Sequence, residues 1–564
     1  MSISLKRYAT FFVRYARPLR RQLALLLGLI LLSIGLQLVN PQLIRFFIDT
    51  ATAGATTASQ TKALMGAALT FLLAALALQG VSVAATYVGE NVGWRATNQL
   101  RSELAAHCLA LDMTFHHQHK PGEMIERLDG DIMDIAILFA QFVVRVLGSI
   151  LLLIGVILVL LFVDWRISLA LGVYALFALV SFTVMRRRAV PFWEANRQAA
   201  ADLFGYLEEQ LSGTEDIRSS GAVPYALRNL FRFAKERLDR EVKGGDMDIQ
   251  FDATWFILYT LGQLVAFGSG YWLFQAGAVT VGTVYLIVYY TDRILQPLNE
   301  ITQQFQNVQK AIAGIHRVES LFAERSTIHE TGQQTLPAGP LSVRFDQVTF
   351  GYNETEPVVR EVSFCLSPGQ VLGLLGRTGS GKTTLTRLLF RLYEPASGCI
   401  YLGDGQPRAL GEYQLDALRS GIGLVTQEVQ HFRATVRDNL TLFNPTIDDV
   451  HIRQVIDELG LHEWFDRLPD GLDSELSGDA GALSAGEARL LSFTGVFVQD
   501  TGLVIWDEAS SRVDPFTERL IERAVDRLLQ GRTGIIIAHR LATVQRADEI
   551  LILQDGQVEE YGPR

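Results

Sequence analysis

The sequence predicts a multi-domain membrane protein in which an all-α domain of six transmembrane helices precedes an α/β domain built around a P-loop. Three observations lead to this prediction. Apolar residues make up 49% of the 564-residue chain and are concentrated in its first 300 positions. Six stretches there are long enough to cross a bilayer, because about 20 residues span a hydrocarbon core of about 30 Å. The second half instead alternates short β-rich runs with helical patterns around a glycine-rich loop.

The overall composition narrows the class of protein. A formal net charge of -10 argues against a nucleic-acid partner, because duplex binding requires a clustered basic face. The chain is longer than a single hydrophobic core supports, so at least two domains are expected. The cysteines have neither metal-binding nor disulfide spacing, and they are expected to be reduced thiols: Cys108, Cys365 and Cys399.

Basic and aromatic residues are interleaved through residues 1–21, which hold six Lys or Arg and no acid. This pattern differs from that of a cleavable signal peptide and predicts a helix lying along the membrane surface. Positive residues that flank a membrane span stay inside, so the N-terminus is expected in the cytoplasm.

The predicted spans are apolar runs with few charges, and they cover residues 22–48, 64–88, 135–163, 167–185, 255–274 and 281–298, the last two being less uniformly apolar. Three arginines, 186–188, follow the fourth span, whereas the loops at 49–61 and 276–280 lack Lys and Arg. The ends of even-numbered spans are therefore expected to be cytoplasmic. Residues 89–134 and 186–252 are charged and helix-prone, so they are predicted to continue the helices into the cytosol.

Short breaks divide these cytosolic extensions near residues 116–122 and 212–221, and each is predicted to hold a short crosswise turn. Residues 326–340 are polar and contain glycine and proline, which is typical of a linker. We therefore predict a membrane domain at residues 1–325 and an α/β domain at residues 341–564. Its expected strands, in a mainly parallel sheet covered by helices, are residues 371–375, 422–426, 503–506 and 533–538.

The P-loop is the sharpest motif in the chain. Residues 376–383 match G-x-x-x-x-G-K-[ST] directly after an apolar strand and before a helical segment. The glycines let backbone N–H groups surround phosphates, while Lys382 is expected to reach the β and γ phosphates and the Thr383 hydroxyl to ligate Mg²⁺. The predicted nucleotide-binding residues here are Gly376, Arg377, Thr378, Gly379, Ser380, Gly381, Lys382, Thr383 and Thr384.

Two carboxylates follow a second apolar strand, at the edge of the sheet where such folds bind ligands. Asp507 suits Mg²⁺ binding, and Glu508 suits the polarisation of a water molecule. This pair favours ATP hydrolysis over inert binding. His539 follows another strand and is a candidate donor to the γ-phosphate, although a lone histidine is more often structural.

In the order of these motifs, and over nearly its whole length, the chain resembles the ABC exporters of the half-transporter type. The resemblance implies that Tyr352 stacks on adenine, that Gln427 contacts Mg²⁺ and senses the membrane domain, and that His539 is the switch histidine. It also implies that each ATP lies between the P-loop of one ATPase domain and the signature loop of another. The signature loop here comprises Ser484, Ala485, Gly486 and Glu487. The breaks at 116–121 and 214–221 correspond to the coupling helices of that family.

The signature loop departs from the pattern of the family, which reads Leu-Ser-Gly-Gly-Gln followed by a basic helix. This chain has Ala485 and Glu487 in the loop, then Leu490 and Gly495 where arginines are usual. A carboxylate close to a γ-phosphate is unfavourable, because like charges repel strongly in a partly dry site. An intact P-loop beside a weakened signature predicts one subunit of a heterodimer; a homodimer that tolerates these changes is the alternative.

We therefore expect an ATPase that uses ATP and Mg²⁺ to export amphipathic drugs, lipids or peptides by alternating access. A multi-pass location in the inner (plasma) membrane is expected, with the ATPase domain in the cytoplasm. An importer of the same fold and an ATP-binding regulator that gates a partner are the alternatives. Three ionisable residues lie in or near apolar stretches: Arg145, Asp292 and Arg293. Two interpretations are open: these residues line a polar cavity, or they lie at the cytoplasmic interface of the membrane.

Overall fold

The computed structural model describes residues 13–53, 58–138, 145–353, 356–426, 431–476, 485–507, 515–538 and 544–564. The chain forms two compact units. The first comprises Met1–Leu109 and Pro121–Glu324, and the second comprises Ala110–Lys120 and Arg325–Arg564. A short segment from within the helical region therefore packs with the C-terminal unit.

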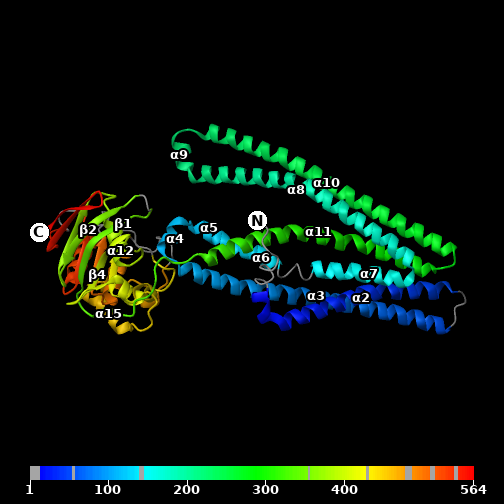
Figure 1. The fold of residues 1–564 in the computed structure, drawn as a ribbon, viewed down its shortest axis with the longest axis horizontal. Coiled ribbons are helices and arrows are strands. Elements are labelled where there is room, and N and C mark those ends of the chain that lie inside the picture. The colour runs from blue at the N-terminus through cyan, green and yellow to red at the C-terminus, as the bar shows by residue number, and fades with distance from the viewer. Residues whose placement is uncertain are drawn as a thin grey trace. The chain divides into compact units, whose positions relative to one another are not determined.

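Long helices build the first unit, with short ones at the start of the third membrane segment (Figure 1). They are η1 (Arg17–Leu19), α2 (Arg20–Thr52), α3 (Ala58–Leu109), α5 (Pro121–Ile125), the π-helix η2 (Glu126–Asp131), α6 (Ile132–Ile137), α7 (Gly148–Val163), α8 (Trp165–Ser212), α9 (Thr214–Ser219), α10 (Val223–Gln275) and α11 (Val281–Ala323). Helices α2 and α3 lie side by side, as do α8 and α10 with α9 joining their far ends. The helical extensions and the crosswise helix α9 are as predicted.

Within the described residues, five helical segments are long and apolar enough to cross a membrane: Val13–Thr52, Ala58–Leu109, Arg145–Val163, Trp165–Ser212 and Val223–Gln275. Each coincides with one of the first five predicted spans. The sixth prediction, residues 281–298, lies in α11, which packs against α2, α7, α8 and α10 but is less apolar because it carries charged and amide side chains. The third predicted span is not one regular helix, since residues 145–147 are π-helical before α7 begins.

Short polar side chains set several helix boundaries in this unit. The Asp164 carboxylate accepts a hydrogen bond from the Arg166 backbone N–H at 2.7 Å and so caps α8. Thr280 caps α11 in the same way. Asp49 of α2 reaches across to this cap, because its carboxylate accepts from the Thr280 hydroxyl and from the Gly282 N–H, each at 2.8 Å. A Cβ at Gly282 would lie 2.5 Å from the Arg45 carbonyl oxygen, so glycine permits this close approach of α2 and α11.

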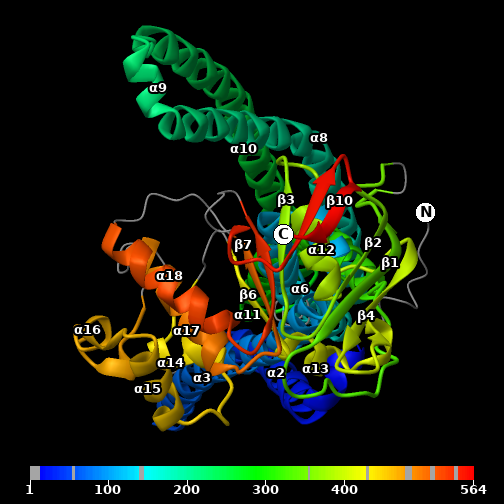
Figure 2. The same ribbon diagram turned by 90° about the vertical axis from the view of Figure 1, so that its left-hand side faces the viewer.

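The second unit contains two sheets and several short helices (Figure 2). Its strands are β1 (Ser342–Phe350), β2 (Val359–Leu366), β3 (Val371–Gly376), β4 (Ser397–Gly403), β5 (Arg408–Ala409), β6 (Ile422–Val425), β7 (Leu503–Asp507), β8 (Thr533–Ile537), β9 (Glu549–Gln554) and β10 (Gln557–Pro563). Its helices are α4 (Met113–Gln118), α12 (Lys382–Leu389), η4 (Leu410–Glu412), α13 (Leu415–Ser420), α14 (Val436–Thr441), α15 (Asp449–Glu458), α16 (His462–Phe465), η5 (Gly471–Asp473), α17 (Ala485–Val498) and α18 (Pro515–Leu529).

The larger sheet has the strand order β10-β9-β3-β8-β7-β6, and all its neighbouring pairs are parallel except β9 with β10. The smaller sheet is antiparallel, in the order β2-β1-β4-β5. Apolar side chains from both sheets and from α12 form one core, and α14 to α18 enclose a second. The four predicted strands are therefore confirmed.

Strand register positions the candidate site. Ile537 of β8 pairs with Leu374 of β3 on one side and with Asp507 of β7 on the other. Because these strands are parallel, their carboxyl ends meet at one edge of the sheet. The P-loop, which follows β3, and Asp507 therefore lie at the same edge.

Candidate functional site

The P-loop joins β3 to α12 through three glycines with positive φ. Gly376, Gly379 and Gly381 have φ angles of 148°, 87° and 104°, a region that side-chain-bearing residues rarely adopt. A Cβ at Gly376 would collide with the Leu553 carbonyl oxygen and would lie 2.6 Å from the Ser380 hydroxyl oxygen. The sequence thus folds this loop tightly, because glycine tolerates these backbone angles and the close approach of Leu553.

Lys382 is the first residue of α12 and its side chain bends back over the loop. The ammonium donates hydrogen bonds to the carbonyl oxygens of Gly376 at 2.7 Å and Arg377 at 2.9 Å. Burial lowers the pKa of Lys382, and the nearby Asp507 carboxylate partly opposes that shift. The positive charge therefore sits buried above the loop, held by uncharged acceptors that an anionic phosphate can replace.

A nucleotide fits the groups that this loop leaves available. The Ser380 side chain is buried, yet its hydroxyl has no hydrogen-bond partner within the described part of the protein. Such an orphaned group is costly unless a ligand or water satisfies it. The N-terminus of α12 also favours negative charge, since its first N–H groups lack intrahelical partners. A chain of phosphates supplies acceptors for both features, so ATP suits the residues present.

The predicted Mg²⁺ ligands are only partly within the described residues. The Thr383 side chain is exposed at the start of α12, and Asp507 ends β7. Gln427, Glu508 and His539 lie outside the described residues. In the part of the chain that the structure describes, no group of three or more His, Cys, Asp or Glu residues is arranged to hold a metal. Mg²⁺ commonly binds through one or two protein oxygens together with substrate phosphates, which suits Thr383 and Asp507.

Tyr352 belongs to an aromatic cluster next to α12. Its hydroxyl oxygen lies 3.3 Å from the Thr384 hydroxyl and accepts a hydrogen bond from Arg387 at 2.9 Å. The rings of Phe350 and Tyr393 pack edge-on against it. These contacts fix the plane of the Tyr352 ring. The Arg387 contact has no signal in the sequence beyond its place one helical turn after the P-loop.

Helix α4 packs with this aromatic cluster, although it precedes it by more than 200 positions. The His117 ring lies 5.6 Å from the Tyr352 ring, and the Tyr393 hydroxyl reaches the Met113 carbonyl oxygen at 3.5 Å. The predicted crosswise turn at residues 116–122 therefore comprises the end of α4 and the start of α5, and α4 touches the residue expected to stack on adenine.

Asp112 holds α4 in place. One oxygen of its carboxylate caps α4 by accepting from the N–H groups of Thr114 and Phe115. The other accepts from the Thr327 N–H, from the Thr327 hydroxyl at 2.7 Å and from the Ser326 hydroxyl at 3.3 Å. Burial raises the pKa of Asp112, but the hydrogen bonds from Thr327, Phe115 and Ser326 outweigh it and hold that pKa below its ordinary value.

Asp112→Asn is expected to loosen α4. An asparagine amide cannot accept on its nitrogen side, so donors of Thr327 or of the helix cap lose their partner, at a cost of about 1–3 kcal/mol. Because its pKa is lowered in the folded protein, the ionised Asp112 carboxylate stabilises the fold at pH values above 3.8, the ordinary carboxyl pKa. This stabilisation is lost as the pH falls through the lowered pKa. Hydrogen exchange of the α4 amides should therefore be faster in the variant at pH 7, and the difference should shrink as the pH falls through the lowered pKa of Asp112. The exposed Asp466→Asn is the matched control; equal protection of α4 in Asp112→Asn and wild type at pH 7 would contradict this role.

The signature region is described from Ala485 onward, which is the first residue of α17, whereas Ser484 lies outside the described residues. Gly486 is buried and Glu487 is half-buried in the first turn of the helix. Leu490 is buried among the apolar side chains of the helical core. A Cβ at Gly495 would lie 3.3 Å from the Leu440 carbonyl oxygen of α14. The unusual Leu490 therefore packs inward, and a charged side chain at this position would have to leave the core.

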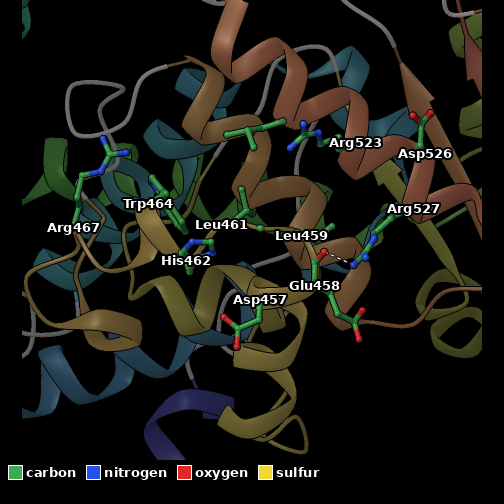
Figure 3. Close-up of a pocket in the computed structure, with 12 residues that line it drawn as sticks. Asp457, Glu458, Leu459, Leu461, His462, Trp464, Arg467, Arg523, Asp526 and Arg527 are labelled. Carbon is green, nitrogen blue, oxygen red and sulfur yellow. Dashed lines mark hydrogen bonds between the residues drawn. The ribbon is translucent and has the colours of Figure 1, made fainter.

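A cavity of about 610 Å³ lies elsewhere in this unit, between α15, α16 and α18 (Figure 3). Negatively charged carboxylates and positively charged arginines both line it. Arg527 donates a hydrogen bond to the Glu458 carbonyl oxygen at its edge. None of the predicted nucleotide-site residues within the described ranges lines this cavity. The P-loop edge of the sheet, and not this cavity, is thus the candidate site.

Comparison with known proteins identifies the family. The family described as "ABC transporter transmembrane region" matches residues 23–298, and the family described as "ABC transporter" matches residues 359–511. The fatty acid ABC transporter ATP-binding/permease protein of Mycobacterium bovis is 30% identical over 470 residues, which cover 82% of this chain and 73% of that protein. This chain belongs to the ABC transporter family.

Two further similarities extend over nearly the whole ABC transporter chain. A multidrug resistance ABC transporter ATP-binding and permease protein of Lactococcus lactis subsp. cremoris is 28% identical over 562 residues, covering 98% of this chain and 91% of that protein. The structure of a bacterial Atm1-family ABC exporter with ATP bound superposes with a TM-score of 0.77 at 22% identity, covering 97% of this chain and 95% of that one. The chain therefore has the ABC exporter fold, with fused transmembrane and ATPase regions, and is an ATP-hydrolysing transporter.

Proposed function

We propose that this ABC transporter subunit exports amphipathic drugs, lipids or peptides across the plasma membrane as one half of a heterodimer. The observation that carries the proposal is the P-loop edge, with its buried lysine and its orphaned hydroxyl, on the same chain as a bundle of long apolar helices. The names of the similar proteins from Mycobacterium bovis and Lactococcus lactis, which refer to fatty acids and multidrug resistance, support an amphipathic cargo. We place the N-terminus and the ATPase unit in the cytoplasm, following the charge of the loops.

Bound ATP supplies the free energy of hydrolysis of its γ-phosphate. In our proposal the P-loop N–H groups and Lys382 hold the phosphates, while Tyr352 stacks on the adenine. Thr383, Gln427 and Asp507 are the residues that would hold Mg²⁺, which would neutralise phosphate charge. Glu508 orients the attacking water and His539 donates to the γ-phosphate.

Helix α4 is well placed to report the state of this site to the membrane helices. It contacts Tyr352 through His117, and only three residues separate it from the end of the membrane-spanning helix α3. Asp112, one of these three, accepts hydrogen bonds from five donors of the second unit, which hold α4 to that unit. We therefore assign α4 the role of a coupling helix, and α9 the same role toward a second subunit.

A second subunit would also cover apolar side chains that one chain leaves exposed. On the polar extensions of α8 and α10, Phe204, Leu211, Phe231 and Leu238 are more than half exposed, with Leu211 reaching 73%. Surface apolar patches of this kind mark interaction sites. The choice of a heterodimer rests on Glu487 in the first turn of α17, because a carboxylate there would face the γ-phosphate of an ATP held by the partner.

ATP turnover of the purified chain tests this proposal, alone and after co-expression with the adjacent transporter gene, beside a Glu508→Gln control. We expect turnover that requires the partner and is lost in the control. Full turnover by the chain alone would contradict the heterodimer, and turnover that persists in Glu508→Gln would contradict the assigned water-orienting role.

A further inference from the structure

A polar cavity lies among the membrane-spanning helices. It has a volume of about 320 Å³ and is lined by residues of α2, α3, α7 and α11, together with Arg145 just before α7. These helices lie next to one another in the first unit (Figure 1). The polar side chains on its wall are Ser33, Gln37, Ser82, Thr86, Arg145, Ser149, Arg293, Gln296 and Glu300. The proposed nucleotide site uses none of them.

The cavity holds an excess of positive charge. Arg145 and Arg293 contribute two guanidinium groups, while Glu300 is the one carboxylate on the wall. Both oxygens of Glu300 already accept from neutral donors, the Ser149 hydroxyl at 2.9 Å and the Gln296 amide at 3.1 Å. Within the described residues neither arginine forms an ion pair; the guanidinium carbon of Arg293 lies 5.4 Å from the Tyr289 ring centre. Both arginines are exposed, so their charges remain open to water or to an anion that enters the cavity.

The depth of the cavity places it in the cytoplasmic half of the bilayer. Arg293 lies about 18 Å along α11 from its first residue, and Arg145 lies about 27 Å before the end of α7, at 1.5 Å per residue. Both helix ends are on the side that we assign to the outside. Against a hydrocarbon core of about 30 Å, the two guanidinium groups are therefore beyond its midplane and toward the cytoplasm.

Apolar side chains also line the cavity. Ile30, Ile34, Ala85 and Leu152 line it and belong to the apolar cluster between α2, α3 and α7. The volume is at the lower end for a small-molecule site, so it accommodates a headgroup and the first part of a tail but not a long chain. The cavity therefore suits a molecule with a compact charged end and an apolar continuation.

We propose that this cavity binds the anionic headgroup of an amphipathic cargo molecule between Arg145 and Arg293. This assignment rests on the export function proposed above and narrows its cargo class from amphipathic to anionic amphipathic. A planar guanidinium presents paired N–H donors that match carboxylate and phosphate oxygens. The two guanidinium groups and the Glu300 carboxylate together carry one net positive charge, which favours a headgroup with a single negative charge. Carboxylate and phosphate headgroups share this chemistry.

Binding of tritiated dodecyl phosphate to the full-length transporter tests the assignment, in phosphatidylcholine nanodiscs without nucleotide. We expect Arg145→Gln and Arg293→Gln each to weaken binding about tenfold, because each removes a charge-assisted hydrogen bond. Glu300→Gln should tighten binding, since it removes the competing carboxylate. Arg95→Gln, which alters an exposed arginine of α3 that does not line the cavity, is the control and should bind as wild type does.

Competition identifies the headgroup that the cavity prefers. Unlabelled dodecanoate should compete if carboxylates are accepted, whereas dodecanol and inorganic phosphate should not, since one lacks the charge and the other the tail. Equal competition by dodecanol, or wild-type affinity in the Arg145→Gln Arg293→Gln double variant, would overturn the assignment. Retained ATP binding by each variant shows that it is folded. Basal ATP turnover of the wild type is measured separately, so a failure of the pump and a failure of this cavity give different results.

Discussion

Replacing Lys382 by alanine is expected to lower the ATP turnover of the transporter by at least about a hundredfold, because removal of one preorganised charged donor typically costs two to three orders of magnitude. The Lys382 ammonium is buried over the P-loop and bonded only to the carbonyl oxygens of Gly376 and Arg377 among the described residues. ATP replaces these uncharged acceptors by phosphate oxygens. The fold should tolerate the change, because the alanine leaves no buried charge behind.

Lysine labelling provides a second measurement that does not depend on activity. Lys382 is the sole lysine between residues 325 and 564. Burial lowers the pKa of Lys382, so at a given pH a larger fraction of Lys382 is the neutral amine than for an exposed lysine. An amine-acylating reagent that reaches the P-loop should therefore modify Lys382 readily. ATP should suppress this labelling, because a bound phosphate stabilises the charged form. Labelling that ATP leaves unchanged, together with full turnover in Lys382→Ala, would remove Lys382 from the site.

Local patterns in the sequence were sufficient to predict most of the architecture. The first five spans, the four strands and the helical extensions follow from continuous apolar runs and regular periodicity, which depend on neighbouring residues alone. The sixth span shows the limit of this approach. Helix α11 combines an apolar outer part with Asp292, Arg293 and Glu300, and the cavity that receives two of these side chains becomes visible only when other helices are placed around it.

Residues 326–340 illustrate a second limit. Their polar, glycine-containing and proline-containing sequence is typical of a linker, yet much of the segment is bound to the ATPase unit. Thr327 donates to Asp112, and Gln334 exchanges backbone hydrogen bonds with Glu412 and Gln414. Each contact joins positions far apart in the chain, so no local pattern indicates it. We keep the boundaries of the linker and of the two domains as proposals.

The candidate site was predictable where one short segment carries the chemistry. The P-loop glycines, Lys382 and the strand that ends at Asp507 are all legible from a few consecutive residues. The support of Tyr352 by Arg387 and His117 was not, because it arises from packing between α12, α4 and β1. The inward packing of Leu490 also appears only in the structure, where a residue that departs from the family pattern proves to belong to the helical core.

Glu487→Gln is expected to raise the affinity of the partner subunit's site for ATP by at least about tenfold. In our proposal this carboxylate faces the γ-phosphate that the partner holds. Two unit charges about 4 Å apart repel by about 4 kcal/mol at an effective dielectric constant of about 20, and each 1.4 kcal/mol corresponds to a factor of ten. Glutamine keeps the size of the side chain and removes the charge. Glu487 lies in the first turn of α17, where an acid favours the helix, so a small loss of stability should accompany the gain in affinity.

Photolabelling of the partner subunit with an azido-ATP analogue measures this affinity in the co-expressed complex. Labelling should saturate at lower nucleotide concentration in Glu487→Gln, whereas turnover at the partner's site should rise only if the partner has a residue equivalent to Glu508. Glu522→Gln, an exposed acid on α18, is the matched control. Unchanged or weaker labelling in Glu487→Gln would mean that the carboxylate does not face the phosphate. The signature loop would then be functional as it stands, and the homodimer would become the better explanation for this chain.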